Sequence, residues 1–497
     1  MIDVRGAWPA KGSSISGMPN ALYYGDNLDV LRTKIADESV DLCYIDPPFN
    51  STRNYHQAHT TVGSEERRMS EAFVDTWTWD ARAIAGYQEL VSNAAGRFTR
   101  QTVALIDGLY HALEGGSLLA YLISMTLRIS EIQRVLKSTG TFYLHCDPTS
   151  SHYLKLILDS VFVAANGEYR NEIIWSYESG GRSKQDFGRK HDVIFRYTKS
   201  KQWVFNAENI LLSREATRHN HMKKGVDADG RPFHSIMSAG KLYKYYADEG
   251  VIPSDVWTEF GHLQQRDPER LGYPTQKPEA LLERIIAASS REGDTVLDAY
   301  CGCGTTLAVA QKMHRNWIGI DITYQSIALV LRRLEGLVSA ADVLSEIVLD
   351  GIPRDLASAQ ALAHQQDERV HNEFAKWAVL TYTRNRAIID SQRGSSERFS
   401  GIVRFKPSQT EDARLIVHVT AGNVERSNIV ALHADMRRTS AVMAVLITLR
   451  PPTAAMIAEA KAAGSYHHDL LNRDYDVMQI VTVADMLERG TTLDIAL

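Results

Sequence analysis

Cysteine is scarce in this chain of 497 residues, which contains Cys43, Cys146, Cys301 and Cys303 and no others. No pair of them has the CxxC or Cys/His spacing of a zinc site, and a Cys-x-Cys pair cannot easily close on itself as a disulfide. We therefore expect no metal site. A function that depends on bound zinc is not supported by the sequence.

Long apolar runs are also lacking. No run approaches the ~20 residues that span a bilayer, and the N-terminus has no basic segment followed by an apolar core. We therefore expect a cytoplasmic protein with no membrane partner. The net charge is −5, so binding to nucleic acid would need a local basic patch. The length predicts two or three domains.

One short motif indicates chemistry. The apolar run of residues 40–45 is typical of a strand, and it ends in Asp46, Pro47, Pro48 and Phe49. Proline stops the strand, which places the Asp46 carboxylate at the sheet edge where ligands bind in open α/β folds. Asp46 and the Pro47 carbonyl could accept both hydrogens of an exocyclic amine while Phe49 stacks on its ring. A proline-terminated strand with a surface acid is the alternative that this motif leaves open.

A second motif predicts a β-α-β unit between residues 294 and 321. Its turn contains Gly302 and Gly304, and glycine lets the backbone approach a ligand closely. Asp321 ends the second strand about 20 residues beyond the turn, where an acid can accept hydrogen bonds from ribose hydroxyls. The pattern indicates a cofactor site.

The details of this turn favour a cationic cofactor. The full GxGxxG pattern of a dinucleotide site is absent, because Thr305 follows Gly304. Asp298 ends the first strand, and an acid suits an ammonium or a sulfonium better than a pyrophosphate. Upstream, the turn at Gln276 and Lys277 could cap the same pocket, although such turns also occur for structural reasons alone.

A basic stretch lies between the two motifs. Residues 182–201 hold seven Lys/Arg against two Asp, with aromatic residues interleaved, which fits a surface that follows a phosphate backbone. The alternative is an ordinary solvated face. The candidate DNA contacts are Arg182, Lys184, Arg189 and Lys190. Residues 203–250 have no clear period and suggest an inserted recognition module.

Together these residues resemble the amino-methylating DNA methyltransferases that use S-adenosylmethionine. The catalytic motif precedes the cofactor motif, as in type III modification subunits, and the resemblance covers about residues 20–340. It implies a methyltransferase domain (1–340) with a Rossmann-like α/β sheet and an inserted target-recognition region at about 178–262. It also implies double-stranded DNA as substrate, a homodimer, and a restriction subunit as a further candidate partner.

The resemblance assigns the site residues. Asp46, Pro47, Pro48 and Phe49 match the catalytic loop. The implied cofactor-binding residues are Asp26, Asn27, Gln276, Lys277, Asp298, Tyr300, Gly302, Gly304, Thr305 and Asp321. The Asp-Pro-Pro-Phe spelling favours N6 of adenine over N4 of cytosine. Cytosine methylation, an RNA substrate, and a DNA-binding subunit with vestigial methylation activity remain the alternatives.

The C-terminal part has a different character. Residues 341–372 are expected to form a helical connector, and 373–497 a small α/β domain that resembles the PD-(D/E)xK restriction endonucleases. Ser400 stands where that family has a metal-binding acid, and residues 418–420 (His-Val-Thr) lack its acid and lysine. Cleavage of this type needs metal-held oxygens. We therefore expect an inactive domain kept for DNA contact, dimerisation or docking.

Overall fold

The computed structural model describes most of the chain. Its described residues are 20–49, 54–59, 68–74, 77–177, 184–213, 222–246, 249–273, 275–337, 347–364, 368–384, 386–389, 400–408, 412–422 and 424–495; at 54–59, 68–74 and 368–372 only the backbone is described. Arg182, one of the predicted DNA contacts, lies outside these residues.

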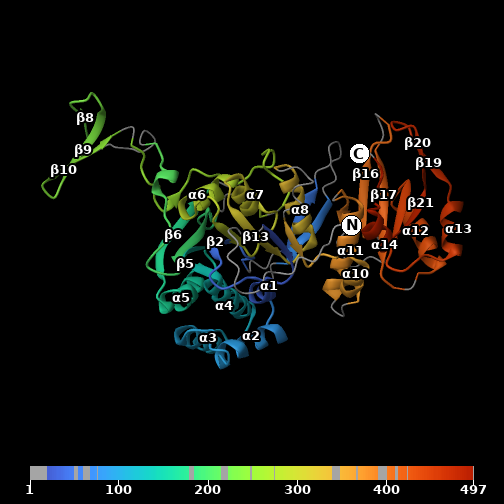
Figure 1. Cartoon of the computed structure of the whole chain (residues 1–497), viewed down its shortest axis with the longest axis horizontal. Coiled ribbons are helices and arrows are strands. Elements are labelled where there is room, and N and C mark those ends of the chain that lie inside the picture. The colour runs from blue at the N-terminus through green and yellow to red at the C-terminus, as the bar shows by residue number, and fades with distance from the viewer. Residues whose placement is uncertain are drawn as a thin grey trace.

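A nine-stranded sheet forms the centre of the molecule, in the order β11-β6-β7-β5-β2-β12-β13-β1-β14 (Figure 1). The strands are β1 (Ala21–Tyr24), β2 (Val40–Ile45), β5 (Leu136–Cys146), β6 (Glu168–Ser176), β7 (His191–Thr198), β11 (Val256–Trp257), β12 (Thr295–Asp298), β13 (Asn316–Asp321) and β14 (Val348–Asp350). β7 runs antiparallel to β5 and β6, while the other neighbours pair in parallel. The prediction of an α/β fold is therefore confirmed.

Helices cover both faces of this sheet, which explains why β2 and β12 are buried almost throughout. One face packs against α1 (Asn27–Lys34), α4 (Ser117–Val135) and α5 (Ser151–Val161). The other packs against α6 (Glu279–Ser289), α7 (Thr305–Lys312) and α8 (Tyr324–Glu335). The three-layer arrangement leaves the carboxyl ends of the central strands as the open edge.

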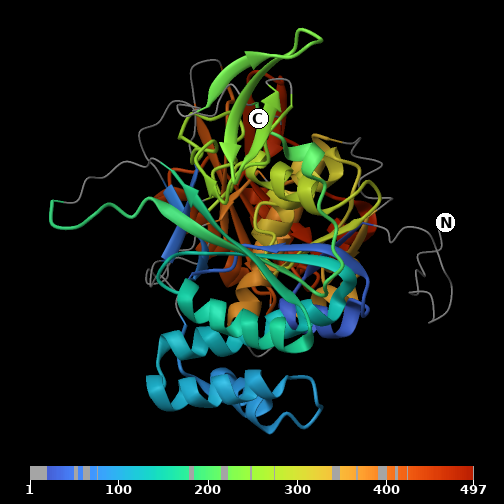
Figure 2. The ribbon, with the colours of Figure 1, turned by 90° about the vertical axis from the view of Figure 1, so that its left-hand side faces the viewer.

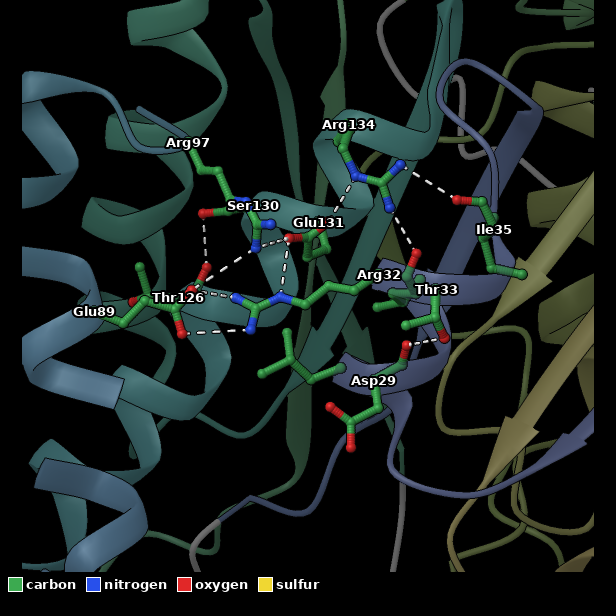
Figure 3. A network of polar contacts seen from close by, with 12 residues as sticks. Asp29, Arg32, Thr33, Ile35, Glu89, Arg97, Thr126, Ser130, Glu131 and Arg134 are labelled. Carbon is green, nitrogen blue, oxygen red and sulfur yellow. Dashed lines mark hydrogen bonds and ion pairs between the residues drawn. The ribbon is translucent and has the colours of Figure 1, made fainter. Parts of the chain in front are cut away.

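A polar network anchors α1 to the helices beside it (Figure 3). Arg32 of α1 contacts Glu89 of α2 (Ala81–Ser92) at 2.5 Å and Glu131 of α4 at 3.2 Å. Arg134 of α4 contacts Glu131 at 2.6 Å and donates to the carbonyl of Leu31 at 2.6 Å. These contacts set the position of α1, whose first turn lies beside the cofactor loop. Helices α2 and α3 (Arg100–Leu113) form an outer layer (Figure 2).

Two further pairings lie outside the main sheet. Strands β8 (Lys223–Val226), β9 (Pro232–Ser238) and β10 (Lys241–Tyr246) form an arm that projects from the body (Figure 1). Strands β3 (Asn54–His59) and β4 (Arg68–Val74) pair antiparallel. Residues 54–59 have no apolar alternation in the sequence, so the pairing with β4 is what orders β3.

The C-terminal part contains a five-stranded mixed sheet in the order β15-β16-β17-β18-β21. Its strands are β15 (Ile388–Ile389), β16 (Gly401–Phe405), β17 (Ala413–Thr420), β18 (Met443–Thr448) and β21 (Met478–Thr482), with a separate pair, β19 (Ser465–His468) and β20 (Arg473–Asp476). The helices are α10 (Leu356–Ala363), α11 (Glu368–Tyr382), α12 (Arg426–Arg438), α13 (Ala454–Ala462) and α14 (Val483–Arg489). Tyr324 of α8 packs with Phe374 and Trp377 of α11, which joins the two sheets through one core.

The predicted helical connector needs a correction. β14 lies inside residues 341–372 and pairs in parallel with β1, Ala21 facing Val348. The central sheet therefore extends to Asp350, ten residues beyond the boundary expected at residue 340. A three-residue strand is too short to give a periodic signal, and the exposed edge of β1 supplies the hydrogen bonds that hold it.

Candidate active site

Asp46 follows β2 at the open edge of the sheet, and its two carboxylate oxygens lie in different environments. Oδ2 contacts Nζ of Lys277, 231 residues away in sequence. Oδ1 is buried and has no hydrogen-bond partner within the described residues. Both side chains are largely buried, with exposed fractions of 13% for Asp46 and 8% for Lys277. A buried acceptor without a donor is costly, so Oδ1 suits a ligand that brings an N–H group.

Sheet order brings the two predicted motifs together. β12 pairs with β2, Leu297 facing Cys43, and also with β13, Asp298 facing Gly319. Three adjacent parallel strands therefore end in acids: Asp46, Asp298 and Asp321. Lys277, predicted on the cofactor side, bridges to the catalytic loop instead of standing apart from it.

Asp298 is a buried acid that has no ion-pair partner among the described residues. Burial, together with the charges of Asp46 and Asp321, raises its pKa to about 7, although two hydrogen bonds lower it. Those bonds come from Thr306 Oγ1 at 2.5 Å and the Tyr300 amide at 3.0 Å. A cationic ligand would supply the missing positive charge. The donor set therefore fits the cationic cofactor expected from the sequence.

The glycine turn has the geometry that its sequence implied. Gly302 and Gly304 have φ values of +50° and +76°, a region that favours glycine. A Cβ at Gly304 would lie 2.8 Å from Val330, and one at Gly302 would lie 3.1 Å from the Tyr273 ring. The Gly302 amide donates to Asp321 Oδ2 at 2.9 Å, and burial raises the pKa of Asp321 to about 6. Thr305 begins α7 directly after the turn.

Three other predicted cofactor residues make structural contacts. Asp26 caps α1 by accepting from the Leu28 amide at 2.8 Å and is also paired with Arg128 at 2.9 Å. Asn27 donates to the carbonyl of Ala299, in the cofactor loop, at 2.8 Å. The Gln276 side chain accepts from the Leu271 amide and donates to the Glu269 carbonyl, each at 2.8 Å. These three residues shape the loops around the site, and their contact with a cofactor stays a prediction.

Three of the predicted DNA contacts are among the described residues, and they lie at the same edge. Lys184 and Arg189 are exposed and Lys190 is half-buried, in the segment that leads into β7. Phe187, between them, is fully exposed, with a fraction of 101%. Their contact with DNA also stays a prediction.

A polar pair that sequence reasoning did not assign lies beside Phe49. His145, fully buried at the end of β5, stacks on Phe49 with ring centroids 5.9 Å apart. Its Nδ1 lies 2.9 Å from the Tyr44 hydroxyl and its Nε2 lies 3.1 Å from Asp192 Oδ2. Burial would raise the pKa of Asp192, but the bond to His145 and nearby positive charge hold it at about 2. The sequence signal that could have identified His145 is the segment His145-Cys146-Asp147-Pro148, where a second apolar strand ends in an acid and a proline.

The described residues contain neither a metal-binding cluster nor a membrane-spanning helix. No group of three or more His, Cys, Asp or Glu side chains could hold a metal ion among them. In the same part of the chain, no helix is long and apolar enough to cross a membrane.

Comparison with known proteins places this geometry in a family. The family model of N6/N4 DNA methylases matches residues 40–331. The DNA adenine methyltransferase YhdJ of Escherichia coli (strain K12) is 28% identical over 316 residues, which are 63% of this chain and 82% of YhdJ. The type II methyltransferase M.HpaI of Haemophilus parainfluenzae is 33% identical over 232 residues, 46% of this chain and 64% of M.HpaI.

Among solved structures, the PvuII DNA methyltransferase (cytosine-N4-specific) aligns with 67% of this chain and 96% of its own, at 14% identity and a TM-score of 0.38. The family model alone covers more than half of the chain, including the three strand ends that carry the site acids. The chain therefore belongs to the N6/N4 family of DNA methylases, amino-methyltransferases that take their methyl group from S-adenosylmethionine.

Proposed function

We propose that this protein methylates N6 of an adenine that has been turned out of double-stranded DNA. The observation that supports this most is the state of Asp46, with Oδ2 held by Lys277 and Oδ1 buried without a partner. An amino group that donates to Oδ1 would satisfy this buried acceptor. Phe49, on the same loop, offers a ring for the base to stack on.

The chemistry required of these residues is modest. The N6 lone pair is delocalised into the purine ring, so the amine is a poor nucleophile until its hydrogens are held. Asp46 Oδ1 and the Pro47 carbonyl accept those hydrogens and stabilise the positive charge that develops on nitrogen. S-adenosylmethionine supplies an electrophilic methyl group on a sulfonium. The adjacency of β2 and β12 aligns donor and acceptor, and alignment provides much of the acceleration.

Asp298 and Asp321 are the residues that would hold the cofactor. The Asp298 carboxylate would face the positive charge of the cofactor, and the Asp321 carboxylate would accept hydrogen bonds from the ribose hydroxyls of the cofactor. Gly302 and Gly304 let the cofactor loop pack against Tyr273 and Val330 more closely than residues with a Cβ could. The spelling Asp-Pro-Pro-Phe is our reason to prefer adenine over cytosine N4, and mass spectrometry of methylated nucleosides separates the two.

The region of residues 178–262 would read the target sequence. It contains the exposed Lys184, Phe187 and Arg189, and the β8–β10 arm. No residue of the arm, 222–246, is fully buried, and it carries five Lys/Arg against two Asp. A basic sheet with no core of its own fits a role on a phosphate backbone.

We infer that the C-terminal domain does not cut DNA. His418, at the position where related nucleases carry an acid, is buried and lies 3.2 Å from Asp435. Incubation of the purified chain with Mg²⁺ and plasmid tests this, because nicking that depends on Asp412 would show an active nuclease.

The central test is Asp46→Ala. We expect methyl transfer to DNA to fall at least 100-fold, as for loss of one stabilising group in a dry site, while calorimetry shows cofactor affinity within about tenfold of wild type. Parallel collapse of cofactor binding would contradict the role given to Asp46. Long-read sequencing of DNA from cells that express the gene would identify the modified base and the target sequence together.

A further inference from the structure

Five aromatic rings form a continuous wall that begins at the catalytic loop. Phe49 stacks on His145, and His145 meets Trp175 edge-on, with centroids 5.6 Å apart. Trp175 in turn contacts Tyr177 and His262, each at 5.0 Å. The wall joins the ends of β2, β5 and β6 to the loop that follows β11.

Burial divides these rings into two kinds. His145 and Trp175 are fully buried and form the interior of the wall. Phe49, Tyr177 and His262 are only half-buried. The half-buried rings are the ones whose surfaces a planar ligand can reach, and Phe49 is already the proposed stacking partner of the base.

The His262 ring is held in place by its neighbours. It meets Tyr177 edge-on, with centroids 3.9 Å apart. The indole N–H of Trp175 donates to the Phe260 carbonyl at 2.9 Å, which fixes the loop two residues before His262. The Arg284 guanidinium of α6 lies 4.3 Å from the Phe260 ring centroid, which gives the same loop a second contact with the body of the protein. The position of His262 is therefore determined by buried elements.

The His262 side chain itself has no polar role within the folded protein. Neither of its ring nitrogens has a hydrogen-bond partner in the described part of the chain, unlike His145 with its two partners. Burial lowers its pKa, against the opposing charge of Asp192, so the ring is neutral at physiological pH. A neutral ring loses less hydration than a charged one when a base covers it.

We propose that His262 is a base-contacting residue, forming with Tyr177 the second wall of the pocket whose first wall is Phe49. The ligand class is the flipped purine of the substrate DNA, and the inference rests on the proposed function. An extruded base leaves two stacking neighbours in the duplex. Aromatic rings on two sides of the pocket replace both of them, and stacking on such rings is a substantial contribution for each base.

The test compares His262→Ala with His262→Phe on two forms of the duplex identified by sequencing. One form has adenine at the target position and measures methyl transfer; the other has 2-aminopurine there, which lacks the N6 amine and reports extrusion alone. We expect His262→Ala to lower the single-turnover methylation rate at least tenfold and to reduce the 2-aminopurine fluorescence change that reports extrusion. His262→Phe, which keeps the ring, should stay within about threefold of wild type. His111→Ala on α3, at a side chain that is 74% exposed, is the control and should match wild type.

The outcomes separate this inference from the proposed function. If wild-type protein methylates DNA and His262→Ala does so equally fast, the inference is overturned while the function stands. It is overturned also if His262→Phe is as slow as His262→Ala, because the ring would then not be what matters. Calorimetry with S-adenosylmethionine must give equal affinity for both variants and wild type, since a loss there would show that His262 acts on the cofactor pocket. Absence of methylation by wild-type protein would refute the proposed function itself.

Discussion

The ion pair between Asp46 and Lys277 should dominate both the stability and the activity of the catalytic loop. With exposed fractions of only 13% and 8%, neither charge can be rehydrated without moving the loops that carry them. Removal of one partner from such a pair costs about 3–5 kcal/mol, because the other charge is left buried and uncompensated. We therefore expect Lys277→Met and Asp46→Asn each to destabilise the methyltransferase domain by about 3 kcal/mol.

The double variant shows whether the two destabilisations come from one coupled ion pair or from two independent effects. Lys277→Met combined with Asp46→Asn leaves no uncompensated charge, so its cost should be close to that of either single change. Non-additivity of about 2–3 kcal/mol is then expected, within the range measured for contacting residues. Urea unfolding followed by tryptophan fluorescence supplies the free energies for the cycle.

A surface pair provides the matched control. Lys34 and Asp350 lie 2.6 Å apart with exposed fractions of 48% and 40%, so water screens their attraction. Lys34→Met should cost less than about 1 kcal/mol. If the Lys277 and Asp46 changes add within about 0.5 kcal/mol, the two charges are not coupled, and the orientation of Oδ1 towards a substrate amine would need another cause.

Three further predictions concern single sites. Because burial raises the pKa of Asp298 to about 7, the carboxylate that a cationic cofactor favours becomes protonated below that pH. Calorimetry should show the affinity for the cofactor falling up to tenfold per pH unit there, and Asp298→Asn should flatten this dependence of affinity on pH. Gly304→Ala should abolish cofactor binding, whereas Gly293→Ala, at a φ of +80° with nothing within 4 Å of the added Cβ, should cost only the ~1 kcal/mol of the backbone conformation in thermal unfolding. Burial lowers the pKa of His418 to about 4, so between about pH 6.5 and pH 4 the unfolded chain binds a proton that the folded domain does not. Urea unfolding should therefore show about 3 kcal/mol of stability lost over that range, and His418→Asn should remove this pH dependence.

The strands of the site could be predicted from the sequence because their signals are local. An apolar run that ends in an acid and then in proline or glycine identifies both its own boundary and the edge at which the acid lies. Asp46, Asp298 and Asp321 all follow that rule, and the sheet places them on adjacent strands. The glycines of the cofactor turn were likewise found from the sequence, and both have positive φ values, which glycine adopts more readily than other residues.

Partners across the sheet could not be predicted, because they depend on strand order and direction. Lys277 was expected to serve the cofactor, and nothing near it in sequence indicates the contact with Asp46. His145 and Asp192 meet only because β7 runs antiparallel to β5, which brings the start of one strand beside the end of the other. Apolar patterns do not distinguish a parallel neighbour from an antiparallel one.

Short and polar strands were missed for a different reason. β14 has only three residues, and β3, which has six, shows no apolar alternation. They are ordered by hydrogen bonds to the backbone of a neighbouring strand, and the side chains of the segment itself do not indicate that pairing. The error moved the edge of the central sheet by ten residues without affecting the site.

The order β7-β5-β2-β12-β13 gives the cleft two chemically distinct sides with Asp46 between them. Carboxylates follow β12 and β13, where burial leaves Asp298 and Asp321 short of positive charge. Aromatic rings and the hydrogen-bonded His145–Asp192 pair lie at the end of β5 and the start of β7. A cationic donor is therefore favoured on one side and a neutral, planar acceptor on the other. Asp46, held by Lys277, stands where the transferred group must cross, so exchanging the two ligands between the sides would leave both of them poorly matched.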